Sequence, residues 1–272
     1  MELHNKSMPA IKELMQYLET LAPVAYQESY DNSGLLVGEA ETEIKGVLLS
    51  LDCTEAVVEE AIQKGCNVIV AHHPIIFKGL KKLNGTSYIE RTVIKAIQNH
   101  ISIYAIHTNL DHVSLGVNGM IAQRLGLSQV RILAPKRETL MKLTFFVPTD
   151  NAEEVLESLY AVGAGHIGNY SHCSFLTTGV GTFKPNEGAN PYLGEKHKLE
   201  RVTEQRVEVI FPVFLERKVM QALRTSHPYE EVAYYLTSMS NENQEVGAGA
   251  IGELETPMDI ADFLTHLKTS MQ

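Results

Sequence analysis

Short apolar runs alternate with helical patterns over the first half of the chain. Three runs have the length and composition of buried strands: Val47–Leu51, Val68–Ala71 and Ile101–Ile106. Between them, apolar residues recur at the three- and four-residue spacing of helices, over 54–62 and 89–98. Apolar strands that are separated by helices predict a parallel sheet with helices on both faces.

Signals for helix ends support this division. Thr54 is placed to cap the helix over 54–62, and Gly65 suits the left-handed position just after it. A further helix is expected from Ser7 to Leu21, with Pro9 in its first turn, where a missing backbone N–H costs nothing. In a sheet of this kind, ligands bind beyond the carboxyl ends of the strands.

The pattern changes near Pro135, where a second domain is expected. Its strands and helices follow the order βαβ–loop–βαβ, which is that of a ferredoxin-like module. The Gly- and Pro-rich stretch 179–198 exceeds an ordinary connection and predicts a lid, a ligand-binding loop or a disordered segment. We therefore divide the chain into a first α/β lobe (1–137), an inserted α+β domain (138–246) and the start of another lobe (247–272).

Composition narrows the class of protein. Lys and Arg number 23 against 33 Asp and Glu, and the net charge of −10 argues against a generic nucleic-acid coat. Three cysteines, Cys53, Cys66 and Cys173, exclude a full disulfide framework and indicate a reducing compartment. The sequence shows no membrane-spanning apolar run and no signal-peptide core, so a cytoplasmic protein without a membrane partner is expected.

Two adjacent histidines, His72 and His73, follow directly on the run Val68–Ala71. Their side chains leave the end of a strand in different directions and can still converge on two neighbouring ions. Neutral imidazole is a common ligand for zinc and other first-row transition metals. The alternative is that both are loop histidines bonded to backbone or water.

A second polar group, His107-Thr-Asn-Leu-Asp111, follows the third strand and should emerge at the same edge. A carboxylate at Asp111 can bridge two metal ions or orient a water, and it can equally be a helix N-cap or an Asx turn. His107 can be a packing histidine. Delivery of three histidines and one carboxylate to one edge by separate strands favours a two-metal site, which activates water and clamps both oxygens of a displacement.

Two other segments carry weaker signals. Asp31 and Asn32 can reach the same edge, although their loop has the composition of a turn. The segment His227–Glu231 contains a histidine and two carboxylates, but its proline and its place before a strand favour a turn. The glycine clusters match no phosphate-binding loop.

Several segments together resemble the Nif-three-like family, whose members are often named GTP cyclohydrolase 1 type 2 homologues. Those in the first lobe are Asp31–Gly38, Ala71–Phe77, His107–Asp111 and Gly116–Asn118. Those in the insertion are Gly163–Tyr170, Cys173–Phe175, Gly179–Pro185 and His227–Glu231. The resemblance covers nearly the whole chain and is to the longer members, which carry an inserted domain.

This resemblance implies a two-lobed α/β protein with a dinuclear metal site between the lobes, an insertion similar to the trimeric PII/CutA signalling fold, and assembly as a homohexamer. It carries over His72, His73 and Asp111 as ligands of two divalent ions of the zinc, iron or manganese class. The family's second lobe adds a His and a Glu in a Gly-His-x-x-x-Glu motif. No such motif follows Gly252, so a site short of ligands and an incomplete second lobe over 247–272 are expected.

Two functions remain open. The first is a metal-dependent hydrolase acting on a small, nucleotide-like substrate, with His107 as the residue that carries the proton. The second is a non-catalytic scaffold or regulator, in which the insertion senses a metabolite or assembles the oligomer and the metals are structural.

Overall fold

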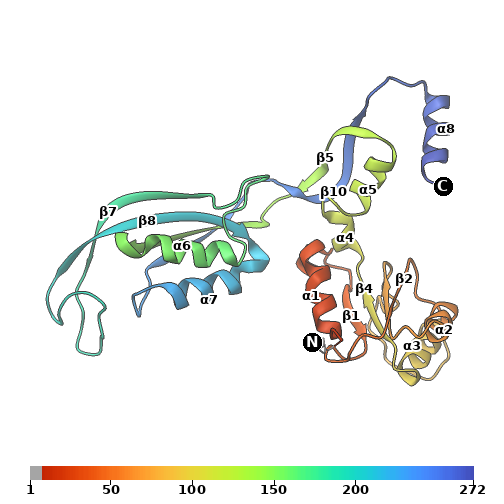
Figure 1. The fold of residues 1–272 in the computed structure, drawn as a ribbon, viewed down its shortest axis with the longest axis horizontal. Coiled ribbons are helices and arrows are strands. Elements are labelled where there is room, and N and C mark those ends of the chain that lie inside the picture. Colours follow the sequence, from red (N-terminus) through yellow and green to blue (C-terminus); the bar gives the residue numbers. More distant parts are fainter. Residues whose placement is uncertain (1–7) are drawn as a thin grey trace, which may run out of the picture. The chain divides into compact units, whose positions relative to one another are not determined.

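The computed structural model describes residues 8–272, so Ser7, the expected start of the first helix, lies outside the described residues. These residues form two compact units (Figure 1). The first contains the chain up to Ala134 together with Glu245–Gln272, and the second is Pro135–Gln244. The assignment of 247–272 to an incomplete lobe stays a prediction.

The first unit contains a sheet of mixed direction. Its strands lie in the order β1 (Gly34–Val37), β4 (Ser102–Ala105), β3 (Val68–Ala71) and β2 (Val47–Ser50). The pairs β2–β3 and β3–β4 are parallel, as the apolar runs predict, whereas β1 joins β4 antiparallel. The α/β class is therefore confirmed, and β1 is an additional edge strand that the sequence pattern did not reveal.

Helices cover both faces of this sheet. On one face, α2 (Glu55–Gln63) and α3 (Tyr88–Gln98) pack on alternate residues of the central strands, including Ile69 and Ile103. On the other face, α1 (Ile11–Leu21) packs on the intervening residues. Those residues are Val68, Val70, Tyr104 and Ile106. Both faces of the central strands are buried, which explains why the runs are almost entirely apolar, with Ser102 as the polar exception.

The ends of α2 agree with the sequence signals. The hydroxyl of Thr54 accepts a hydrogen bond from the backbone N–H of Val57, and Gly65 has a φ of 67°. Thr54 thus satisfies one of the free backbone N–H groups in the first turn, and Gly65 permits the left-handed turn after the helix.

The remaining elements of the first unit are short helices and one strand pair. They are η1 (Val24–Tyr26), α4 (Thr108–His112), α5 (Val117–Arg124), β5 (Leu127–Lys136), β10 (Asn243–Leu254) and α8 (Ile260–Ser270). The glycine-rich stretch 247–252 is part of β10, which pairs with β5. No helix within residues 8–272 is long and apolar enough to cross a bilayer.

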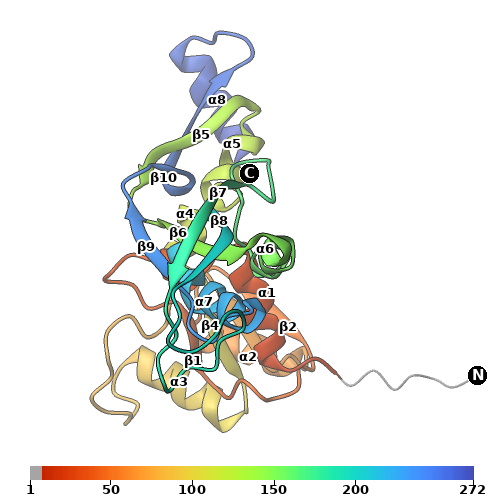
Figure 2. The ribbon, with the colours of Figure 1, turned by 90° about the vertical axis from the view of Figure 1, so that its left-hand side faces the viewer.

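The second unit is an antiparallel sheet with two helices on one side (Figure 1 and Figure 2). Its elements in chain order are β6 (Leu140–Pro148), η2 (Thr149–Asn151), α6 (Ala152–Ala161), β7 (Ser174–Phe183), β8 (Glu200–Pro212), η3 (Val213–Leu215), α7 (Glu216–Ser226) and β9 (Tyr234–Met239). The strand order across the sheet is β7-β8-β6-β9. Inward-facing Leu143, Phe145 and Val147 of β6 pack against α6 and α7.

The expected long loop over 179–198 begins later than its glycines suggest. Residues 179–183 belong to β7 and pair with β8, so the connection is 184–199. A Cβ at Gly181 would overlap the carboxylate of Glu204 on the neighbouring strand. This glycine therefore leaves room for a side chain of the sheet and does not mark a loop.

The segment His227–Glu231 connects α7 to β9, and its histidine is part of the interior. His227 is 7% exposed, its Nε2 lies 2.9 Å from the carbonyl of Phe146, and its Nδ1 accepts a hydrogen bond from the backbone N–H of Tyr229 at 3.0 Å. The ring is therefore neutral, with its proton on Nε2. Burial lowers the pKa of His227, and the hydrogen bond to Phe146 only partly opposes this effect.

A lowered pKa makes the second unit sensitive to acid. Below about pH 6.5 the unfolded chain binds a proton at His227 that the folded chain rejects, so the free energy of unfolding falls as the pH decreases. We expect the His227→Gln variant to lose part of this slope, at most about 1.4 kcal/mol per pH unit. Chemical denaturation of both proteins between pH 5 and pH 8 measures it, and equal slopes would contradict the assignment.

Candidate metal centre

The carboxyl ends of the three parallel strands meet at one edge of the sheet in the first unit. Ser50, Ala71 and Ala105 are register partners across β2, β3 and β4, so the residues after them leave the sheet together. Strand β1 runs in the opposite direction and starts at Gly34, opposite Ala105. The segment before β1 therefore enters at the same edge, and four segments bring side chains to one place.

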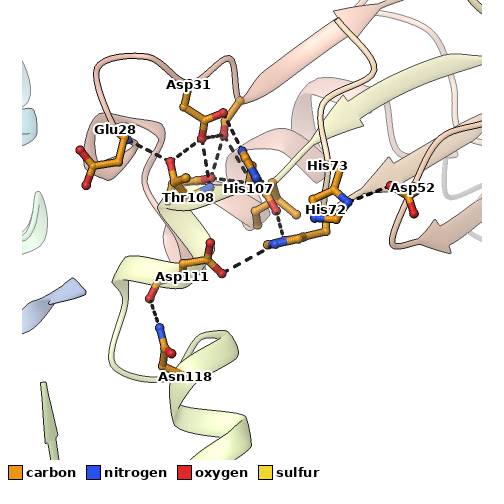
Figure 3. Close-up of polar contacts among 12 residues, drawn as sticks. Glu28, Asp31, Asp52, His72, His73, His107, Thr108, Asp111 and Asn118 are labelled. Atoms are coloured by element: carbon orange, nitrogen blue, oxygen red, sulfur yellow. Dashed lines mark hydrogen bonds and ion pairs between the residues drawn. The ribbon is translucent and has the colours of Figure 1, made fainter. Parts of the chain in front are cut away.

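Three imidazole rings gather at this edge (Figure 3). The ring centroids of His72 and His73 are 5.0 Å apart, and the centroid of His107 lies 5.2 Å from the first and 5.5 Å from the second. One ring nitrogen of each histidine lies within 4.8 Å of those of the other two. Nitrogen atoms at this spacing can hold a metal ion.

An oxygen acceptor orients each of the two adjacent rings. Nδ1 of His72 lies 2.9 Å from the carbonyl oxygen of Ile106, and Nδ1 of His73 lies 2.8 Å from Oδ1 of Asp52. A carbonyl oxygen or an ionised carboxylate can only accept, so each ring carries a proton on Nδ1. A neutral ring then keeps its lone pair on Nε2, which is the atom prepared to bind a metal.

Asp31 is the buried acceptor for the third ring. Its side chain is 0% exposed, and its Oδ1 accepts from Nδ1 of His107 at 2.8 Å. Its Oδ2 accepts from the backbone N–H of Thr108 at 3.0 Å and from the hydroxyl of the same residue. Burial alone would raise the pKa of Asp31, but the hydrogen bonds from Thr108, His107 and the backbone of Asn32 outweigh it and lower the pKa to about 2. Asp31 is thus an ionised acceptor, and His107 also keeps its lone pair on Nε2.

Asp111 supplies a carboxylate beside these rings. It lies in α4, one turn after His107, and its Oδ1 is 3.7 Å from Nε2 of His72 (Figure 3). Its backbone carbonyl accepts a hydrogen bond from the side-chain amide of Asn118, which links α4 to α5. The side chain is about one-third exposed and is accessible to a ligand.

The structure brings His72, His73, His107 and Asp111 to one edge, as the order of strands predicts. Their roles as ligands and proton carrier stay predictions. The alternative that Asp111 is a helix N-cap is wrong, because His107 occupies the N-cap position of α4. Asp31 belongs to the group although its loop composition favoured a plain turn.

Sequence reasoning missed Asp52. This residue lies two positions after the end of β2, at the same edge as the histidines, and its position relative to the strand was the available signal. Apolar periodicity locates strands but gives no reason to select a single aspartate in a loop after one of them.

A scan against protein-family models matches residues 9–272 to the family described as Duf34/NIF3 (NGG1p interacting factor 3). The chain belongs to the Duf34/NIF3 family. It is 43% identical over 256 residues to a protein of Halalkalibacterium halodurans named GTP cyclohydrolase 1 type 2 homolog, covering 94% of this chain and 69% of that relative. A protein of the same name from Bacillus subtilis is 41% identical over 261 residues, covering 96% and 70%.

Two solved structures are also similar to this chain. A Bacillus cereus protein related to NIF3 has a TM-score of 0.85 and 43% identity, with 98% of this chain and 71% of that chain covered. The Staphylococcus aureus protein SA1388 has a TM-score of 0.70 and 31% identity, with 97% and 69% covered. The chain thus spans about 70% of the length of these relatives.

The two aspartates should differ in their effect on stability. The variant Asp31→Asn places a buried NH₂ group opposite hydrogen-bond donors of His107 and Thr108, where a carboxylate oxygen accepted before. We therefore expect the free energy of unfolding to fall by about 1–3 kcal/mol. The matched change Asp52→Asn alters a side chain that is 62% exposed and should cost less than about 0.5 kcal/mol. Urea denaturation compares the two variants, and a similar loss in both would contradict the buried-anchor interpretation.

Proposed function

We propose that His72, His73 and Asp111 bind two divalent metal ions and that the site is that of a metal-dependent hydrolase. The observation that carries this proposal is the cluster of ring nitrogens within 4.8 Å, with the Nδ1 atom of every ring committed to an oxygen acceptor. A packing histidine needs no such arrangement of its second nitrogen. With Nδ1 bonded to an oxygen acceptor, His72 and His73 each keep a lone pair on Nε2 for a metal ion, and the ring of His107 lies beside them.

The donor set fits a first-row transition metal. Imidazole nitrogen and carboxylate oxygen together suit zinc, iron and manganese, whereas calcium and magnesium prefer oxygen ligands throughout. Asp111 has two carboxylate oxygens and lies to one side of His72, so it is the residue suited to bridge two ions. The site includes no thiol among these four residues, which excludes a zinc-thiolate centre made by them.

When bound, a pair of divalent ions lowers the pKa of a coordinated water and stabilises the charge that develops on the substrate. His107 is the residue that we assign to proton transfer. Its Nδ1–H donates to the ionised Asp31, which fixes the ring and stabilises the imidazolium formed when Nε2 takes up a proton. The same hydrogen bond holds the ring of His107 beside those of His72 and His73.

The substrate class rests on the names of the relatives. Two of them, from Halalkalibacterium halodurans and Bacillus subtilis, are named GTP cyclohydrolase 1 type 2 homolog. We therefore propose a small, nucleotide-like substrate and a cytoplasmic location. A cytosolic reducing environment also agrees with the three free cysteines, Cys53, Cys66 and Cys173.

A non-catalytic role as scaffold or metabolite-sensing regulator is the second candidate. It is favoured by the second unit, whose βαββαβ order and strand order β7-β8-β6-β9 we assign to a ferredoxin-like fold similar to PII and CutA. Phe175 and Tyr235, both more than half exposed on the side of this sheet opposite the helices, support self-association, for which we propose a homohexamer.

Metal binding can be tested on the full chain by dialysis against Zn²⁺ or Mn²⁺ and elemental analysis. We expect about two ions for each chain in the wild-type protein, and affinities reduced at least about tenfold in the variants His73→Ala and Asp111→Ala. His166→Ala removes an exposed histidine of the second unit and is the matched control. Equal metal contents in all four proteins would contradict the proposed site.

Hydrolysis can be tested with a panel of nucleotides, starting with GTP, in the presence of each metal. The variant His107→Ala should retain its metal and lose about 10²- to 10⁴-fold in kcat, because it lacks the proton carrier. Loss of metal in this variant would instead identify His107 as a ligand. Absence of turnover with every nucleotide, together with stabilisation by one of them in a thermal-shift assay, would favour the regulator.

A further inference from the structure

The second unit contains a cavity of about 460 Å³ that the proposed function does not use. Its walls come from the end of β7, the connection 184–199, strand β8 and the segment His227–Glu231. This volume lies within the range typical of small-molecule sites. The cavity also accounts for two sequence features that the metal centre leaves unexplained, the Gly- and Pro-rich connection and the His-Pro-Tyr-Glu-Glu segment.

Aromatic rings form one side of the cavity. The ring of Tyr229 has its centroid 5.9 Å from that of Phe183 and 6.3 Å from that of Tyr192. The three rings come from the segment after α7, the end of β7 and the connection 184–199. Three aromatic rings therefore line the same space, and the face of an aromatic ring attracts a cation.

A buried carboxylate lies among these rings. Glu204 is only 7% exposed, and its Oε1 accepts a hydrogen bond from the hydroxyl of Tyr229 at 2.9 Å. Within the described residues, no lysine, arginine or histidine pairs with Glu204, and its Oε2 has no hydrogen-bond donor. This carboxylate borders the cavity, where Gly181 leaves room for it. A buried carboxylate is stabilised by a positive partner, and the protein supplies only a neutral hydroxyl.

The walls are held in place by hydrogen bonds. His227 fixes the backbone of Tyr229 through its Nδ1, as described above. Glu230 accepts a hydrogen bond from the backbone N–H of Asn190 at 2.8 Å, which ties the connection 184–199 to the segment after α7. The ring of Tyr229 and the carboxylate of Glu204 are therefore positioned before any ligand enters.

The charges around the cavity have one predominant sign. Its ionisable lining residues are Glu204, Glu230, Glu231 and Lys184, which gives three negative charges against one positive charge. The other walls include the apolar residues Pro185, Pro191 and Leu193. A simple metal ion needs several oxygen ligands and gains nothing from apolar walls. An anion would meet the wrong charge.

We propose that this cavity binds a small organic cation, an amine whose ammonium group pairs with Glu204 and lies against the rings of Tyr229 and Tyr192, while its apolar body contacts the proline- and leucine-lined wall. The site is separate from the metal centre in residues and in chemistry. It gives the second unit a ligand class of its own, whichever of the two candidate functions holds for the first unit.

The test compares ligands of one shape and different charge by calorimetric titration of the full chain. The probes are 2-phenylethylamine, the neutral 2-phenylethanol and the anionic 3-phenylpropionate. We expect saturable binding of the amine, with the alcohol at least about tenfold weaker and the acid not bound. Equal binding of amine and alcohol, or no binding of the amine up to about 10 mM, would overturn the proposal.

Variants locate the binding. Glu204→Gln keeps an acceptor for Tyr229 and removes the charge, so the affinity for the amine should fall about tenfold or more, whereas Glu154→Gln on the exposed surface of α6 should leave it unchanged. Tyr192→Ala, at a half-exposed ring outside the strands and helices, tests the same site without risk to the core.

Two controls complete the design. Tyr170→Ala, at another exposed tyrosine, should leave the amine affinity unchanged, as should His73→Ala in the metal centre. Full amine affinity in both Glu204→Gln and Tyr192→Ala would place the binding elsewhere and overturn the proposal. Loss of amine affinity in His73→Ala would do the same, since it would assign the amine to the metal centre.

Discussion

The parallel pairing of β2, β3 and β4 brings three segments of the candidate metal centre to one edge of the sheet. The last residues of these strands, Ser50, Ala71 and Ala105, are in register, so the segments after them leave the sheet at one edge. Asp52, His72, His73 and His107 follow these ends within two residues. A shift in the pairing of one strand would separate a histidine from its neighbours and from the acceptor on its Nδ1. The burial of both sheet faces opposes such a shift, and the apolar core thereby fixes a polar site.

The candidate metal centre and the cavity of the second unit both contain polar atoms that the described part of the protein leaves without a hydrogen bond, but the atoms differ in kind. In the candidate metal centre, carboxylates accept hydrogen bonds from the Nδ1–H groups of His73 and His107, so the Nε2 atoms of these rings keep their lone pairs. In the second unit, His227 is itself saturated by backbone groups, and the unsatisfied atom belongs to the carboxylate of Glu204. The first arrangement can hold a metal ion, whereas the second suits the organic cation that we propose, because such a cation brings its own hydrogen-bond donors.

The sequence revealed those elements whose burial is uniform. The runs ending at Ala71 and near Ala105 are buried at every position, and they led directly to the edge where the histidines lie. Strand β1 is short and only partly buried, and β10 contains three glycines, so neither has the apolar pattern of a strand. Asp52 was missed, and Asp31 was interpreted as a turn residue, because the importance of each depends on which ring it faces. That pairing joins residues far apart in the chain, and no local pattern encodes it.

The two carboxylate–imidazole pairs differ in their contact with solvent. Asp31 is fully enclosed and His107 is 19% exposed, whereas Asp52 and His73 have exposures of 62% and 47%. One wall of the centre is consequently rigid, and the opposite wall is held by a hydrogen bond for which water competes at every moment. The His73–Asp52 pair is therefore the more easily broken of the two pairs. A metal ion bound as proposed would exchange more readily on the side of His73 than on the enclosed side of Asp31.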